Sequence, residues 1–139
     1  MSLKLQLVRN GDVIFELPLS PLEWSKKHLE DEFRAIEEDF ERFSKIFDAL
    51  SHETRLRMMK RLMEEDDLTI SFSDFMHDLD LNPKLVWENA RKLRESGLLE
   101  KVGRGRYRCS EFGESGFMLI SFAFRRLIDA LEEMNKFER

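Results

Sequence analysis

The chain contains one cysteine, Cys109, in 139 residues, which excludes an internal disulfide and a zinc site built from several cysteines. It also lacks an apolar run of the roughly 20 residues that cross a bilayer, and no charged-then-apolar leader opens it. Glycine-rich phosphate loops and nucleophile–histidine sets with a positioned partner are missing, so we expect no enzymatic activity. These absences predict a cytoplasmic protein without a cofactor.

Basic residues are outnumbered by acidic ones, 23 to 28, and the formal net charge is −5. The charges are unevenly distributed. Residues 23–53 carry ten acidic and five basic side chains, whereas residues 84–108 carry eight basic and three acidic ones. Only the second segment suits contact with phosphates. A charged fraction of 37%, with few amide side chains, is compatible with a thermophilic or archaeal source.

The hydrophobic fraction of 42% is sufficient for a core, and the length suits one domain with an appendage. Residues 3–19 predict a β-hairpin around Asn10-Gly11. We expect the three-residue loop 9–11, because that register gathers the apolar side chains on one face. These are Leu3, Leu5, Leu7, Val13, Phe15 and Leu17. A lone hairpin is barely stable in water, so this face is expected to cover the body of the domain or a second subunit.

Two long stretches have apolar residues at alternating spacings of three and four, as on one face of a helix. The first follows the helix start at Ser20-Pro21 and contains Leu29, Phe33, Ile36, Phe40, Phe43, Phe47 and Leu50. The second begins near Glu114 and contains Phe117, Ile120, Phe124, Leu127, Leu131 and Met134. Each face is either a core stripe of its own subunit or a contact across a dimer interface. The interface candidates are Phe33, Ile36, Phe40, Phe117, Ile120, Phe124, Leu127 and Leu131.

The segment between these helices has the order of elements of a winged helix-turn-helix. It predicts a helix over 54–64 that buries Leu56, Met59 and Leu62, and a helix over 71–79 with Phe75 and Leu79 on one face. A third helix is expected to start at the N-cap Asn82 with Pro83 at its first position and to end at the left-handed cap Gly97. Its inner face is expected to be Val86, Ala90 and Leu93. A hairpin with strands 98–102 and 106–110 follows. We therefore expect a mainly α fold with small β content, in which a winged helix-turn-helix carries an N-terminal β-hairpin and long N- and C-terminal helices. The predicted parts are residues 1–19, 20–113 and 114–139.

The same segment resembles a known family. "IFDALSHETRLRMMKRL" (46–62), "LRESGLLEKVGRGRYR" (93–108) and "CSEFGESG" (109–116) are similar to stretches of the ArsR-type winged-helix regulators. The resemblance covers about residues 46–117. It implies a homodimeric transcriptional regulator whose third helix enters the major groove of DNA. The N-terminal hairpin and its long helix lie outside the family pattern.

The residues themselves indicate where DNA would bind. The third helix, about 83–96, would lie in the major groove, and the hairpin 98–110 would lie on the backbone or in the minor groove. The predicted DNA-binding residues are Lys84, Trp87, Glu88, Arg91, Arg94, Arg104, Arg106 and Arg108. Along the second strand the arginines would face outward while Tyr107 and Cys109 face inward. The alternative function is a winged helix kept as a protein-interaction module of a transcription or repair assembly, with Trp87 on the partner.

Metal sensing is not expected. Metal-sensing members of the family carry a cysteine pair and an acid where this chain has residues 71–74, Ser-Phe-Ser-Asp, and the histidines His28, His52 and His77 lack ligand spacing. Cys109 is expected to be a small buried hydrophobic residue.

Overall fold

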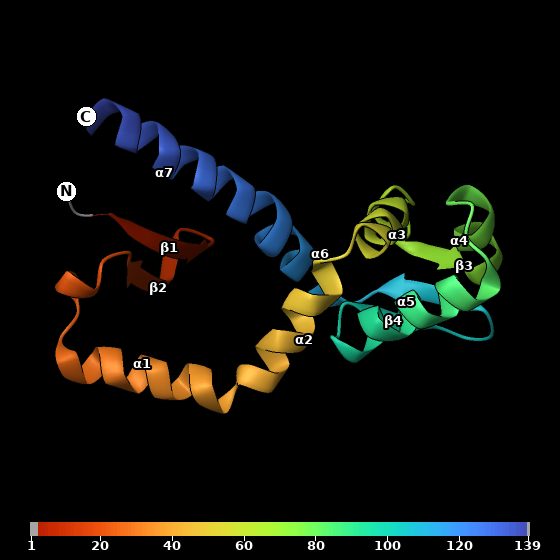
Figure 1. Cartoon of the computed structure of the whole chain (residues 1–139), viewed down its shortest axis with the longest axis horizontal. Coiled ribbons are helices and arrows are strands. Elements are labelled where there is room, and N and C mark those ends of the chain that lie inside the picture. Colours follow the sequence, from red (N-terminus) through yellow and green to blue (C-terminus); the bar gives the residue numbers. More distant parts are fainter. Residues whose placement is uncertain (1–2, 139) are drawn as a thin grey trace. The chain divides into compact units, whose positions relative to one another are not determined.

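The computed structural model describes residues 3–138 and is mainly helical with two small antiparallel sheets, which confirms the predicted fold class at that level. The chain divides into two compact units, residues 1–41 and residues 42–139. The first unit contains a hairpin and one α-helix, and the second contains a three-stranded sheet and most of the helices (Figure 1).

The hairpin of the first unit consists of β1 (Lys4–Arg9) and β2 (Asp12–Pro18). The predicted three-residue loop is wrong. Arg9 pairs with Asp12, so the loop is the dipeptide Asn10-Gly11, whose φ angles are 51° and 85°. Asparagine and glycine tolerate the left-handed conformation that both central positions of such a tight turn require, and this local preference decides the loop length.

A β-bulge next to the turn changes which side chains share a face of the hairpin. The register shifts between Leu7 and Val8, so that Leu7 pairs with Phe15 and Leu5 with Leu17. Directly opposed residues share a face, so these four side chains lie together as predicted. Val13 pairs with Val8 on the other face, which corrects its predicted position. The hairpin therefore presents apolar side chains on both faces.

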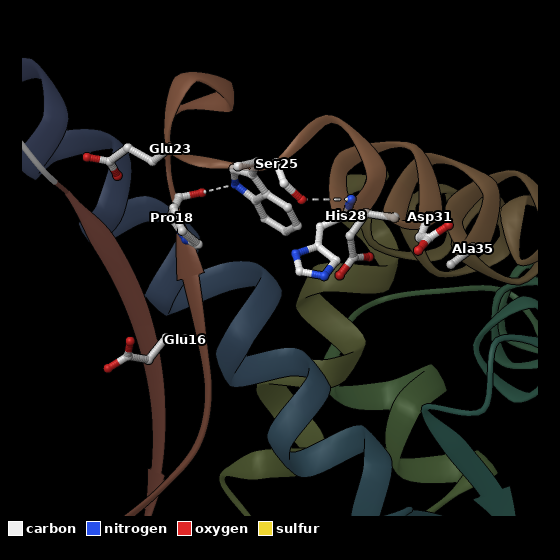
Figure 2. A pocket seen from close by; sticks show the side chains of 9 residues that line it. Glu16, Pro18, Glu23, Ser25, His28, Asp31 and Ala35 are labelled. Atoms are coloured by element: carbon white, nitrogen blue, oxygen red, sulfur yellow. Dashed lines mark hydrogen bonds between the residues drawn. The ribbon is translucent and has the colours of Figure 1, made fainter.

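A 3₁₀ turn, η1 (Pro21–Glu23), and the helix α1 (Lys26–Glu38) complete this unit. Ser20 caps only the short turn. The helix has its own N-cap, Ser25, whose Oγ accepts a hydrogen bond from the His28 N–H at 3.2 Å (Figure 2). Between the two caps Trp24 is extended, and its indole Nε1 donates to the Pro18 carbonyl at 3.0 Å. The predicted helix start at Ser20 therefore holds for one turn.

The predicted long helix over 29–50 is two helices. α1 ends at Glu38 and α2 spans Phe40–Leu50, with Asp39 non-helical between them (φ −97°, ψ 7°). The apolar spacing continues across the break, which is why periodicity alone did not reveal it. Glu37, Glu38 and Asp39 put negative charge at the carbonyl end of α1, where the helix dipole disfavours it, and this favours the interruption.

Unit 2 contains a three-stranded antiparallel sheet in the order β3-β5-β4 (Figure 1). The strands are β3 (Thr69–Ser71), β4 (Leu99–Lys101) and β5 (Arg106–Cys109). The predicted hairpin of β4 and β5 is confirmed, while β3 was not predicted. Three residues are too short to show an alternating pattern, and β3 is a strand because Ile70 pairs with Tyr107 of β5.

Five helices of unit 2 line a core of buried apolar side chains. They are α2, α3 (Glu53–Met63), α4 (Phe72–Asp78), α5 (Pro83–Glu95) and α6 (Glu111–Phe117). The chain continues through a π-helical segment η2 (Met118–Ala123) into α7 (Phe124–Glu138), in which none of the residues 124–136 is buried. Phe75, Val86, Ala90 and Leu93 are buried, as predicted. Leu56 is 37% exposed, against prediction, because α3 buries the face that contains Arg55, Met58, Met59 and Leu62.

The last helical stretch begins earlier than predicted. Ser110 is its N-cap and accepts from the Gly113 N–H at 2.7 Å, so α6 starts at Glu111 rather than near Glu114. A Cβ at Gly113 would lie 2.1 Å from the Leu98 carbonyl oxygen. The absence of a side chain there lets α6 approach the chain before β4, and this approach holds α6 against the core.

Candidate nucleic-acid interface

The helix α5 is anchored at its start and along one face. The Asn82 Oδ1 accepts from the Leu85 N–H at 2.9 Å, and Pro83 occupies the first turn, as predicted. The buried face points Val86 and Leu93, both 0% exposed, into the core. The opposite face is therefore fixed toward solvent.

The predicted contact residues of α5 occupy that outer face. Lys84, Trp87, Arg91 and Arg94 are exposed and Glu88 is half-buried. Two of the three cations are paired within the helix: Lys84 Nζ lies 3.9 Å from Glu88, and Arg91 lies 3.6 Å from Glu95. The charges on this face therefore largely cancel.

Trp87 has a specific neighbour. The Arg91 guanidinium lies 5.2 Å from the centre of the Trp87 ring, within the range of a cation–π contact. The indole is nevertheless 56% exposed. An exposed aromatic ring beside a cation offers a flat surface for a base, a methyl group or a protein side chain.

The hairpin of β4 and β5 carries the remaining candidates. Arg106 and Arg108 are exposed while Tyr107 and Cys109 are 4% and 5% exposed, so the predicted alternation is confirmed. Arg108 forms an ion pair with Glu100 at 3.1 Å. Among residues 3–138, no hydrogen bond or ion pair engages the side chain of Arg106.

Arg104 lies at the tip of this hairpin between two glycines with φ angles of 79° and 68°, Gly103 and Gly105. A side chain at either glycine would be strained in that conformation. The Gly105 carbonyl accepts from the Phe72 N–H at 2.8 Å, which ties the tip to the start of α4. Arg104 is exposed, and its guanidinium has no partner within the described part of the chain. The hairpin therefore offers two unpaired arginines.

The end of α5 lies near the hairpin. Burial raises the pKa of Tyr107, and the positive charge of Arg94 opposes that shift, which places the guanidinium within electrostatic range of the phenol. Arg94 of α5 and Arg104 and Arg106 of the hairpin are all exposed, and none of the three has an acidic partner among residues 3–138. We call these three residues the basic edge.

Cys109 is a buried hydrophobic residue, as predicted. Burial, with smaller contributions from Glu114 and Glu100, raises the pKa of its thiol to about 11. The thiol is therefore protonated at neutral pH, which suits packing rather than reactivity.

The sequence reasoning missed a buried polar pair below this surface. Asn89, which the sequence places beside the candidate contacts Trp87 and Glu88, is 7% exposed and accepts from Arg55 at 2.9 Å. Its position between Val86 and Leu93, three and four residues away, was a signal that it lies on the inner face.

The predicted dimer-interface residues differ in exposure. Phe33, Ile36 and Phe40 are 57%, 48% and 66% exposed, and Phe124 is 60% exposed. Ile120, Leu127 and Leu131 are half-buried. Phe117 is 5% exposed and packs in the core of its own chain, because α6 turns it toward the sheet.

Other binding chemistry has little support in the described residues. An open hollow in unit 1 is lined by Trp24, His28 and the carboxylates of Glu16, Glu23, Asp31 and Glu32, a set that repels phosphates (Figure 2). Between residues 3 and 138, no group of three or more His, Cys, Asp or Glu side chains is placed to hold a metal ion. No helix in that range combines the length and apolar character needed to cross a bilayer.

No protein-family model and no curated protein matches the chain. The geometry of α5 and the hairpin is therefore the basis on which a function is assigned to the chain.

Proposed function

We propose that this chain is an ArsR-type winged helix-turn-helix regulator of transcription that binds duplex DNA as a homodimer in the cytoplasm. In this proposal α5 is the recognition helix, and the hairpin of β4 and β5 is the wing. The observation that carries the proposal is the basic edge, in which two unpaired arginines of the wing and Arg94 at the end of α5 are exposed. This is the arrangement needed to contact phosphates and base edges together.

The order of the elements supports the fold assignment. α3, α4 and α5 follow one another with short connections, and a hairpin follows α5 directly. β3, between α3 and α4, pairs with β5 and completes the sheet beside the wing. A helix-turn-helix with a wing is built in this order.

The charge pattern supports a division of labour between α5 and the wing. Lys84 and Arg91 are each paired with a glutamate, so α5 contributes little net charge to non-specific binding. Arg104 and Arg106 supply phosphate contacts, and such contacts account for most of the affinity for random DNA. Glu88 can accept from a cytosine amino group, and the Trp87 ring can contact a thymine methyl.

The homodimer is supported by apolar side chains that the single chain leaves uncovered. Six of the phenylalanines between residues 33 and 124 are 41% or more exposed: Phe33, Phe40, Phe47, Phe112, Phe122 and Phe124. Exposed aromatic surface on this scale marks an association surface. A two-fold dimer would cover it on both chains at once.

The alternative, a protein-interaction module, is favoured by the exposed apolar residues around the recognition surface. Leu85 and Trp87 are 40% and 56% exposed on α5, and Leu56 on α3 is 37% exposed. Exposed tryptophan is enriched among the residues that dominate protein interfaces. Under this alternative the chain would not bind duplex DNA.

The deciding experiment is fluorescence anisotropy of a labelled random duplex over a salt series. We expect wild type to bind with an affinity that falls steeply with salt, and Arg104→Ala/Arg106→Ala to lower the log–log slope by roughly two, about one for each lost phosphate contact. The matched control is Arg125→Ala/Arg126→Ala, which removes the same charge from two exposed arginines of α7 and should leave the slope unchanged. Absence of binding at low salt would favour the interaction module.

A further inference from the structure

A buried arginine connects α2 to α5. Arg55 of α3 is 4% exposed. Its Nε donates to the Ala49 carbonyl at 2.7 Å and its Nη2 to the Asp48 carbonyl at 2.8 Å, both at the end of α2. Its Nη1 donates to the Asn89 Oδ1 of α5 at 2.9 Å. One guanidinium thus joins three helices.

Asn89 is itself fully engaged. Its Nδ2 donates to the Leu85 carbonyl at 2.8 Å, one turn earlier in α5. The amide is therefore held at both ends, by its own helix and by Arg55. A second link lies nearby at the surface, where Lys92 Nζ lies 3.5 Å from Asp48 Oδ2.

None of the acceptors that Arg55 contacts within residues 3–138 is a carboxylate. Its charge is balanced by backbone carbonyls at the end of α2, where the helix dipole is negative. Such a buried polar arrangement is rarely more stable than apolar side chains of the same volume. What this arrangement supplies is a defined orientation of the packed helices, since a hydrogen bond tolerates less rotation than an apolar contact.

We propose that Arg55 and Asn89 are positioning residues that fix the rotation of α5 against α2. This inference rests on the proposed function for its meaning in DNA recognition. The apolar face of α5 (Val86, Ala90 and Leu93) holds the helix against the core. The Arg55–Asn89 contact fixes the rotation of the helix about its own axis. That rotation turns Trp87, Glu88 and Arg91 outward together. Without the contact, α5 still packs, but its outer side chains no longer hold a single alignment against the bases.

The test separates stability from alignment. Arg55→Met and Asn89→Leu each leave a buried polar group unpaired and should destabilise the fold. The double variant Arg55→Met/Asn89→Leu leaves no unpaired Asn89 amide and no unpaired guanidinium, so its thermal midpoint should recover part of the way toward that of wild type. The Asp48 and Ala49 carbonyls at the end of α2 still lose their donor, which limits the recovery. A duplex selected by wild type from a randomised pool, and the random pool itself, are the two probes. We expect the affinity ratio between them to stay about tenfold lower in the double variant, the loss expected for one base contact.

Two further variants sharpen the test. Asn89→Asp keeps an acceptor for Arg55 and should retain the ratio within about twofold. Arg61→Met is the matched control, because Arg61 lies on the same helix and bonds to Glu65 and Asp78 instead, at 2.7 and 2.9 Å. It should lower the thermal midpoint without changing the ratio. Recovery of both stability and ratio in Arg55→Met/Asn89→Leu would overturn the inference. If the double variant does not fold, equal ratios in Asn89→Leu and Asn89→Asp would also overturn it.

A separate readout distinguishes this inference from the proposed function. Amide hydrogen exchange along α5 needs no DNA. At matched thermal midpoint, α5 should exchange about tenfold faster in Arg55→Met/Asn89→Leu than in wild type. If wild type binds no duplex, the DNA-binding proposal fails while faster exchange still supports the positioning role. Unchanged exchange together with an unchanged ratio would contradict that role even if DNA binding holds.

Discussion

The two units of the chain use apolar residues in opposite ways. Unit 1 has no buried residue among positions 3–41, although β1 and β2 are rich in leucine and valine and α1 contains Leu29, Phe33 and Ile36. Unit 2 buries large side chains completely, with Phe75, Met58 and Leu62 at 0% exposure. Since burial of apolar surface is the main source of stability, unit 2 has an interior of its own and unit 1 does not.

Charge separates the units as well. Residues 1–41 carry ten acidic and five basic side chains, a net charge of −5 that equals that of the whole chain. Residues 42–139 carry eighteen of each and are neutral, with the basic segment 84–108 concentrated in one place. The negative net charge of the chain therefore comes from unit 1 and does not describe the surface of α5 and the hairpin.

The largest expected effect concerns the interior. Phe75→Ala should destabilise unit 2 by about 3–5 kcal/mol, because it empties a fully buried site. Phe33→Ala, the matched change at a 57% exposed position of unit 1, should change the unfolding free energy of unit 2 by about 0.5 kcal/mol or less. Urea unfolding followed by Trp87 fluorescence in a Trp24→Phe background measures both. Equal costs would refute the contrast between the units.

Alkaline pH tests the same interior. The pKa of Cys109 is raised to about 11 from an ordinary value of 9.0, so the folded state holds the proton more tightly than the unfolded state. The resulting stability is complete below pH 9 and is lost between pH 9 and 11. Burial raises the pKa of Tyr107 too, and the sign is the same. Cys109→Ala should flatten the dependence of the urea midpoint on pH in this interval. If the urea midpoint of Cys109→Ala falls with pH as steeply as that of wild type, the Cys109 thiol is not the cause of the pH dependence.

These contrasts also explain what was predictable from the sequence. The caps at Asn82 and Gly97, the inner face of α5 and the alternation of Arg106 with Tyr107 are local or periodic, and they were predicted. The position of the turn at Asn10-Gly11 was predicted, but its two-residue length was not. The longer loop was chosen to bring the apolar side chains to one face, and in the structure a bulge next to the turn does this for most of them.

Contacts between distant segments left weaker signals. The strand β3 is defined only by its pairing with β5. The Arg55–Asn89 contact joins residues 34 positions apart, and neither residue differs in type from those on a solvated helix face. The spacing of apolar residues shows which side chains share a face of a helix, but it does not show whether the helix is continuous. For this reason the predicted helix ran across Asp39, where the structure has a break. Such features are tertiary and have no local pattern.

Association tests whether a second copy covers the exposed apolar side chains. We expect wild type to sediment as a dimer at micromolar concentration, and Phe40→Glu and Phe124→Glu to shift it to the 16.6 kDa monomer. Both side chains are exposed, at 66% and 60%, so the charge should weaken association while unit 2 keeps its helical circular dichroism. A monomeric wild type would contradict the homodimer.

The smallest effect concerns the acidic charge of the two units. Glu88→Gln removes a carboxylate from the outer face of α5 and frees Lys84, its partner at 3.9 Å. We expect the affinity for a random duplex to rise by about two- to fivefold at low salt, since one repulsion is removed and one phosphate contact is gained. Glu38→Gln removes the same charge from unit 1 and is the matched control. All the proposed DNA contacts lie in unit 2, and exposed charges act over only about 8 Å at physiological salt. We therefore expect Glu38→Gln to change the affinity there by less than about twofold. Anisotropy titrations of both variants at low and physiological salt measure the difference.

An equal gain in affinity from Glu38→Gln at physiological salt would mean that the negative charge of unit 1 acts on the bound DNA directly. The affinity for DNA would then depend on the net charge of the whole chain, −5, and not on the charge of unit 2 alone.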